Sequence, residues 1–410
     1  MLPVSSVFSG SFADTKPHYE LLDGLRGVAA LLVLVYHIFE GFAFAESVNG
    51  DGNGLISTLN HGHVAVDFFF ILSGFVISYA YDDRWGKMSL GTFFKRRLIR
   101  LHPMLVMGAI IGVAAFAFVG FEKWDGNAAP AFWVMLALLL TMLMVPAVPG
   151  APYEVRGNGE MFPLNGPSWS LFFEYIGNIL YALFIRKFST KMLAVFVAVS
   201  GIAHACFFAG DVSGYDCVGV GWTIDKVNFW GGLVRMLFPF ATGMLLARTF
   251  KPREIKGAFW ICSALLITLF AVPYIAPVSE KYSLNSLYEV ACIAFVFPGI
   301  VWLGACGKCS GITARVNKFL GDLSYPLYIV HYPIMYIFYA WLIEKRVYTW
   351  GETWLASSAV LAASVALAWI CLKFYDVPVR RWLAGKLKQR TKSVPEQGRS
   401  RFLPGTFFIE

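Results

Sequence analysis

Long apolar stretches, repeated along the chain, constrain the fold of this sequence more than any other feature. Each has close to the ~20 residues that an α-helix needs to cross the hydrocarbon core of a bilayer. Only 15% of the 410 residues are charged, against roughly 25% in soluble domains. The stretches therefore predict a polytopic membrane protein with ten spans: 24–44, 64–81, 98–119, 168–185, 192–209, 229–247, 258–276, 287–305, 325–343 and 353–373.

The distribution of Lys and Arg between the connecting loops predicts the orientation of these helices. Most of the 34 Lys and Arg residues lie in alternate loops and in the chain after Lys373, and cytoplasmic loops carry such an excess. Lys95-Arg96-Arg97 and Arg186-Lys187 therefore mark the cytoplasmic side, with both termini on it. Because orientation accounts for the net charge of +8, we expect the lipid bilayer and no nucleic acid as a partner.

A further apolar segment, 131–148, fits this alternation only if it does not cross the bilayer. The span before it ends on the outer side, and the span after it, 168–185, must begin there. A re-entrant segment is tolerated where protein or a water-filled cavity satisfies its backbone. The expected fold class is all-α, with ten transmembrane helices and one re-entrant segment. We expect a cytoplasmic N-terminal segment 1–21, a transmembrane domain 22–385 and a flexible basic tail 386–410.

The first predicted helix carries two ionisable residues on one face. Arg26 and His37 are eleven residues apart, about three helical turns, so they point the same way with roughly 16 Å between them along the axis. Ionisable residues inside the membrane are costly and indicate functional sites. The alternative is that Arg26 anchors the topology and His37 is a bonded structural group. Glu40 lies one turn from His37 and is placed to orient its ring.

The remaining polar residues fall into two layers. Arg97 and Arg100 share a helix face on the cytoplasmic side, and with Arg26 they offer guanidinium forks suited to phosphates, such as the nucleotide end of coenzyme A, unless they only anchor the topology. The pair Cys306 and Cys309 supplies too few ligands for zinc, so we expect no metal site. The deeper and outer layer comprises His37, Glu40, Asp67, Glu174, Arg235, Glu289 and His204.

Five segments, in order along the chain, resemble the motifs of acyltransferase family 3, the integral-membrane O-acyltransferases. The first runs from Leu22 to Gly27 and is closed by His37, which gives an Arg-x10-His pattern. Each motif is weak alone, whereas five in order at consistent depths are specific. The other four lie at 66–75, 94–103, 169–174 and 320–331.

The resemblance implies transfer of an acyl group, often acetyl, from cytoplasmic acyl-CoA to a hydroxyl of a carbohydrate or glycolipid at the outer face. Acyl-CoA is then a co-substrate and no separate cofactor is expected. The resemblance makes His37 the catalytic histidine, Arg26 its motif partner and Glu174 a third member of the catalytic set. We expect a multi-pass protein of a bacterial cytoplasmic (inner) membrane.

The same carry-over assigns the two substrates. Arg97 and Arg100 hold the donor, and Ser73-Gly74-Phe75 line the path of its acyl chain. Trp169 and Glu174 serve the acceptor side. The remaining substrate-side residues are Asp67, Tyr325 and His331, of which His331 has an alternative reading as a core histidine.

Two other classes of protein compete with an enzyme. A proton-coupled transporter, exporting a glycolipid or small solute, also uses intramembrane His, Asp and Glu, but it does not explain the arginines at the inner side. A receptor-like protein leaves the aligned Arg26 and His37 unexplained. We therefore expect His37 to act as a general base, either in direct transfer or through a transient acyl-histidine.

Overall fold

The computed structural model describes residues 19–51, 60–251, 253–275 and 283–392. Within these ranges the chain is helical and forms no strand, only isolated bridges. Nine of the described helical stretches are long and apolar enough to cross a membrane, so the protein is a polytopic membrane protein. The helices are α1 (Glu20–Asn49), α2 (Ala65–Tyr81), α3 (Leu90–Phe118), α4 (Ala131–Met142), α5 (Ser168–Leu183), α6 (Thr190–Ala209), α7 (Lys226–Thr249), α8 (Ala258–Phe270), α9 (Leu284–Ala291), α10 (Phe297–Ala305), α11 (Gly311–Lys345), α12 (Trp350–Cys371) and α13 (Val377–Lys392).

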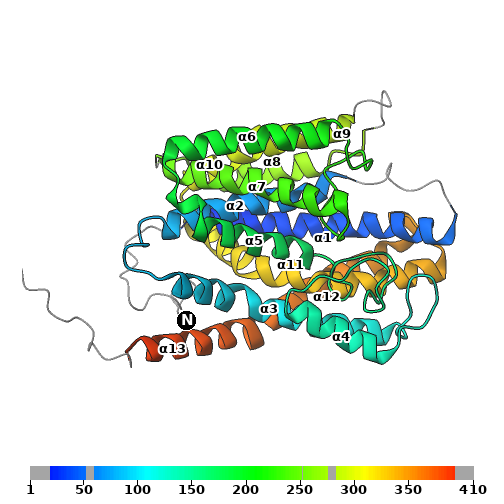
Figure 1. The fold of residues 1–410 in the computed structure, drawn as a ribbon. Coiled ribbons are helices and arrows are strands. Elements are labelled where there is room, and N and C mark those ends of the chain that lie inside the picture. Colours follow the sequence, from blue (N-terminus) through cyan, green and yellow to red (C-terminus); the bar gives the residue numbers. More distant parts are fainter. Residues whose placement is uncertain (1–18, 52–59, 252, 276–282, 393–410) are drawn as a thin grey trace, which may run out of the picture.

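The long helices run side by side, with α1 and α11 at the centre of the bundle (Figure 1). We call the end that carries Arg96 and Arg186 the basic end, and the other the opposite end. The seventh predicted span, 258–276, forms the 13-residue helix α8, which is shorter than the nine helical stretches that reach the length of a membrane span. It still connects both ends, because Ile255 before it bridges to Gly307 and Pro273 after it bridges to Asn60.

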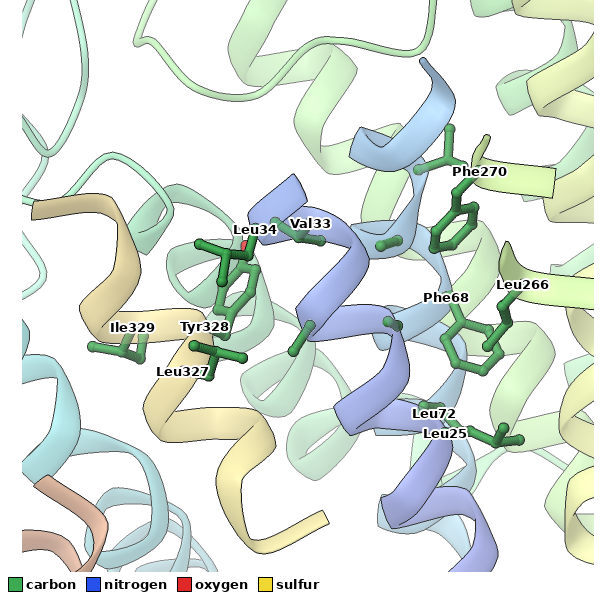
Figure 2. Packing of buried hydrophobic residues seen from close by; sticks show 14 of the residues in the cluster. Leu25, Val33, Leu34, Phe68, Leu72, Leu266, Phe270, Leu327, Tyr328 and Ile329 are labelled. Atoms are coloured by element: carbon green, nitrogen blue, oxygen red, sulfur yellow. The ribbon is translucent and has the colours of Figure 1, made fainter. Parts of the chain in front are cut away.

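Helices α1 and α11 pack closely because glycines line their contact. A Cβ atom on Gly27 would lie 2.3 Å from the carbonyl oxygen of Leu320, and one on Gly41 would meet the ring of Tyr339. Small residues let helix backbones approach in this way. Figure 2 shows the result: Leu34 of α1 faces α11, while Leu25 lies on the other side of α1, beside Leu72 of α2. The central position of α1 encloses its polar residues inside the protein.

The segment predicted to be re-entrant contains the short helix α4. It has 12 residues, too few to cross a bilayer by length, and it packs against α3. The loops on either side of α4 both join the loop that precedes α5. Before α4, the Trp124 amide donates to Arg156 O at 3.0 Å, and after it, the Ala147 amide donates to Met161 O at 2.7 Å. This geometry agrees with a segment that enters and leaves at one end of the bundle.

The C-terminal part differs from a simple span followed by a tail. A π-helical turn, Leu372–Asp376, joins α12 to α13, so the helical stretch continues beyond the predicted span 353–373. Residues 386–392 are helical although we expected a tail to begin there. The rest of that tail, 393–410, and most of the predicted N-terminal segment lie outside the described residues.

Candidate active site

His37 lies on α1 with a carboxylate one turn away. Its Nδ1 is 2.6 Å from Glu40 Oε2, as the spacing of the two residues predicts. A carboxylate that accepts from Nδ1–H fixes the tautomer and leaves Nε2 with its lone pair. The side chain of His37 is 14% exposed and that of Glu40 is 31% exposed. The pair is therefore largely buried but still accessible to solvent. This arrangement gives a buried, oriented imidazole that can accept a proton.

Tyrosines of α11 hold the carboxylate of this pair. The hydroxyl of Tyr339 donates to Glu40 Oε2 at 2.9 Å, and the Tyr332 hydroxyl lies 3.5 Å from the same oxygen. The ring of Tyr332 also packs edge-on against His37, with 4.8 Å between ring centroids. These tyrosines are not among the site residues predicted from the sequence, although Tyr332, Tyr336 and Tyr339 recur on one helix face. Their spacing is the signal that would have found them.

His331 lies directly beside His37. The two ring centroids are 5.2 Å apart, and the His331 Nδ1–H donates to Leu327 O at 3.0 Å. Its Nε2 has no hydrogen-bond partner within the described part of the chain, and the residue is 1% exposed. The structure therefore places this predicted substrate residue in contact with the candidate base, as a second imidazole of the same site.

A cavity of about 240 Å³ leads into the bundle from the basic end. Glu20, Lys318 and Asp322 line it at that end, and Tyr328 and Ile329 line it deeper in the bundle. His37 itself is not among the lining residues. The Tyr328 ring lies 6.0 Å from that of His331, so the cavity ends one side chain short of the His331–His37 pair.

The three predicted donor-side arginines all line this cavity. Arg26 pairs with Asp23 at 3.2 Å and Arg97 with Glu174 at 2.6 Å. Arg100 has no ion-pair partner among the residues that the structure describes, and it lies within electrostatic range of Arg26. The arrangement suits an anionic ligand, because several guanidinium forks face one enclosed space.

Glu174 lies elsewhere than we expected. We expected it on the acceptor side, but it lines the cavity and accepts hydrogen bonds from Arg97 Nη2 and, at 2.7 Å, from Ser73 Oγ. Helix α5 is already fully buried at its first residue, Ser168, and Glu174 lies about 1.7 helical turns further along it. Glu174 therefore belongs with the arginines.

Of the three residues predicted to line the acyl path, only Ser73 lines the cavity. A Cβ atom on Gly74 would lie 1.9 Å from Phe240 O, so this glycine serves the contact between α2 and α7. Successive helical residues point about 100° apart, which prevents three in a row from facing one cavity. The ring of Phe75 packs instead against Tyr19, Tyr79 and Phe250.

Two further substrate-side predictions fall outside the cavity. Asp67 is fully buried and forms a bidentate ion pair with Arg235, with Nη2 and Oδ2 2.8 Å apart. The Arg235 guanidinium lies over the ring of Trp169 at 5.1 Å. These three residues join α2, α5 and α7, so their contacts are those of a structural cluster. Tyr325 does line the cavity, and its hydroxyl donates to Leu101 O.

The fold and the site define a class of protein. It is a helical membrane protein with a cavity lined by arginines, and beyond the deep end of this cavity lies a histidine that is hydrogen-bonded to a carboxylate. Comparison with known proteins gives the family. The family described as an acyltransferase domain, acyltransferase family 3, matches residues 19–373. The chain belongs to this family. It is therefore an enzyme, an acyltransferase of groups other than aminoacyl groups, which decides against the transporter and receptor alternatives.

Curated relatives carry related names. Acyltransferase MdmB of Streptomyces mycarofaciens is 28% identical over 361 residues, covering 85% of this chain and 86% of that protein. Peptidoglycan O-acetyltransferase OatA of Listeria monocytogenes is 24% identical over 390 residues, 90% of this chain but 56% of OatA. Protein 2 in picA locus of Rhizobium radiobacter is 32% identical over 194 residues, 44% of this chain and 90% of that protein. No solved structure matches the chain.

Proposed function

We propose that this protein is an O-acyltransferase that moves an acyl group, in the first place acetyl, from acyl-CoA to a hydroxyl of a carbohydrate or glycolipid. The observation that carries this proposal is the arrangement on α1, where Arg26 lines the cavity and His37 lies beyond its deep end. The name of the Listeria relative, a peptidoglycan O-acetyltransferase, supports a carbohydrate acceptor. No cofactor besides the acyl-CoA co-substrate enters the proposal.

The donor enters from the basic end. In the proposal this end faces the cytoplasm of a bacterial cytoplasmic (inner) membrane, because Lys and Arg collect there, and both termini lie on that side. Arg26, Arg97 and Arg100 hold the phosphates of coenzyme A by charge-assisted hydrogen bonds. The thioester arm then follows the cavity toward Tyr328. The hydroxyl of Tyr328 is 2.7 Å from Ser170 Oγ. In the proposal, movement of the Tyr328 side chain lets the thioester reach His37.

The acceptor meets the acyl group at His37. Nε2 removes the proton of the acceptor hydroxyl while the oxygen bonds to the thioester carbonyl carbon, and the carbon–sulfur bond breaks. The thiolate of coenzyme A then takes the proton from the imidazolium, so the catalyst is restored. Glu40 holds the ring and stabilises its positive charge. General-base catalysis of this kind is worth roughly 10²–10⁴ in rate. Transfer through an acyl-histidine uses the same residues.

Radiolabelled acetyl-CoA and the detergent-purified full chain test the proposal. We expect donor consumption and label transfer to a glycan acceptor. We expect His37→Gln, which keeps a hydrogen-bonding side chain but is no base, to lose roughly 10² or more of the rate while still binding coenzyme A. His204→Gln is the matched control, because His204 is buried against the rings of Phe208 and Phe238, on helix α6, which packs against α7 and α9.

Two outcomes contradict the proposal. Near-parental turnover by His37→Gln would show that His37 only positions other groups, and the base would then be sought first at His331. Solute uptake into vesicles without donor consumption would contradict acyl transfer from coenzyme A altogether.

A further inference from the structure

The cavity has a fourth arginine, which comes from the C-terminal helix. Arg380 of α13 lines it together with Arg26, Arg97 and Arg100. The match to the acyltransferase family ends at residue 373, so α13 lies beyond the part of the chain that defines the family. Figure 1 shows α13 beside the start of α3, and the two helices are in contact. Helix α3 is the one that carries Arg97 and Arg100.

The π-helical turn before α13 sets up this arginine. A π-helical segment accommodates an extra residue within a helix and is frequent at functional sites. Its last residue, Asp376, is fully buried and forms an ion pair with Arg380, one turn further on. The Arg380 side chain is 14% exposed, and its Nε has no hydrogen-bond partner among the described residues. The guanidinium is therefore held in place while part of its donor capacity is unused.

Close to Arg380 the cationic side chains outnumber the anionic ones, because Arg380 and Arg100 both lie near the carboxylate of Asp376. Among the described residues, Arg26 pairs with Asp23, Arg97 with Glu174 and Arg380 with Asp376. Arg100 has no carboxylate partner in the described part of the chain, and it lies within electrostatic range of both Asp376 and Arg380. Two like charges lining one cavity repel each other until an anion lies between them. A phosphate matches two guanidinium forks in both charge and geometry.

We propose that Arg380 is a phosphate-binding residue of the donor site, supplied by α13 and positioned by Asp376. The inference rests on the proposed function, in which the donor is acyl-CoA and therefore carries phosphate esters. It extends the donor site beyond the residues that match the family, and it means that α13 closes one wall of the cavity. An anionic lipid headgroup has the same phosphate chemistry, so the experiment must separate the two sources.

Equilibrium binding of coenzyme A to the full chain tests the inference, with the protein in discs of neutral lipid and titration calorimetry as the readout. We expect Arg380→Ala to weaken binding about tenfold, as the loss of one charge-assisted contact predicts. The affinity of Arg380→Lys for coenzyme A should lie between those of the parent and of Arg380→Ala, because lysine keeps the charge but loses the guanidinium fork. Arg381→Ala is the matched control: Arg381 is the exposed neighbour on the same helix, so this variant should bind as the parent does.

A second variant separates a loss of coenzyme A binding from an effect of misfolding. Arg380→Ala alone leaves Asp376 buried and unpaired, which is destabilising. The double variant Asp376→Asn/Arg380→Ala removes both charges together. We expect it to show the same loss of coenzyme A affinity as Arg380→Ala, with a melting temperature close to that of the parent.

Three results would overturn the inference. Parental affinity in the double variant would make Asp376–Arg380 a purely structural ion pair. A loss that appears only in binding of added phosphatidylglycerol, with coenzyme A affinity unchanged, would assign Arg380 to lipid. If the parent binds no coenzyme A, the proposed function is overturned and this inference with it. If the parent binds coenzyme A and the double variant binds it with the same affinity, only the inference is overturned.

Discussion

At the scale of single residues, the contact between His37 and Glu40 links structure to reactivity. The carboxylate accepts from Nδ1 at 2.6 Å and is itself held by Tyr339. We expect Glu40→Gln to lower the rate of acyl transfer at least about tenfold, because the amide no longer fixes the tautomer or stabilises the imidazolium. The measurement is kcat with KM for both substrates, and KM for acetyl-CoA should stay parental.

The control for this prediction is Glu344→Gln near the end of α11, where the side chain is exposed. It should leave kcat unchanged. A Glu40→Gln enzyme with parental kcat would show that the imidazole needs no carboxylate, and the orienting role would pass to the tyrosines of α11.

The arginines of the cavity should differ in their effect on the donor. Arg97 is paired with Glu174, whereas Arg100 has no carboxylate partner among the described residues. A phosphate gains more from an unpaired guanidinium, so we expect Arg100→Ala to raise KM for acetyl-CoA about tenfold and Arg97→Ala to raise it less. Lysine at either position should rescue only in part, since it loses the fork. If both alanine variants insert normally and keep the parental KM, the arginines are topology anchors.

At the scale of elements, α4 is the segment whose path is easiest to test. It is 12 residues long and its flanking loops are hydrogen-bonded to the loop before α5. We expect single cysteines at Asp125 and Val148, before and after α4, to be labelled from the same side of the membrane. Both positions are exposed, and the background lacks the seven native cysteines.

The side that is labelled also tests the orientation. We expect an impermeant thiol reagent to reach both cysteines from outside the cell, and a cysteine at the exposed position Lys187 to react only after lysis. Labelling of Asp125 and Val148 from different sides would show that α4 crosses, which would also invert the predicted direction of α5.

At the scale of the whole molecule, the loop before α5 is fastened to the bundle by buried polar groups. Arg156 is fully buried, with its guanidinium 4.3 Å from the ring centroid of Phe116 and 3.9 Å from that of Tyr336. Such cation–π contacts offset part of the cost of burying the charge. Glu160, in the same loop, accepts from the Tyr336 hydroxyl and from Asn158. The loop therefore closes the opposite end of the protein over α11.

The carboxyl of Glu160 should make stability depend on pH. Burial raises the pKa of Glu160 from its ordinary value of 4.5 to about 7, against the opposing effects of the hydrogen bonds and of Arg156. Below pH 4.5 the group is protonated in both states. Between the two pKa values the folded state keeps a proton that the unfolded state has lost, so stability falls as pH rises and levels off above pH 7. The full effect is roughly 3 kcal/mol.

Thermal unfolding of the purified protein from about pH 5 to 8 measures this effect. We expect the melting temperature of the parent to fall across the window, and Glu160→Gln to raise it at the upper end and flatten the profile. Glu122→Gln, at an exposed position at the same end of the protein, should behave as the parent does. A parental profile that is flat, or a Glu160→Gln protein that melts lower than the parent at pH 8, would contradict the prediction.

Patterns within single helices were the reliable part of the sequence analysis. The apolar stretches predicted a polytopic helical protein, and five ordered motifs predicted the family. The spacing of His37 and Glu40 predicted their contact, because residues three apart on a helix are neighbours whatever surrounds them. The depth and the surroundings of single side chains were predicted less well. Glu174 proved to belong with the arginines, and Gly74 with the contact between α2 and α7.

By itself the sequence determined the membrane class, the face shared by Arg26 and His37, and the cluster of arginines at one end, since these follow from hydrophobicity and helical period alone. Only the tertiary structure decided which side chains from different helices meet. It placed His331 beside His37, Glu174 against Arg97, and Arg380 in a cavity whose other arginines lie far earlier in the chain. Such contacts depend on how helices cross and rotate, which is set by packing between distant segments rather than by any local pattern.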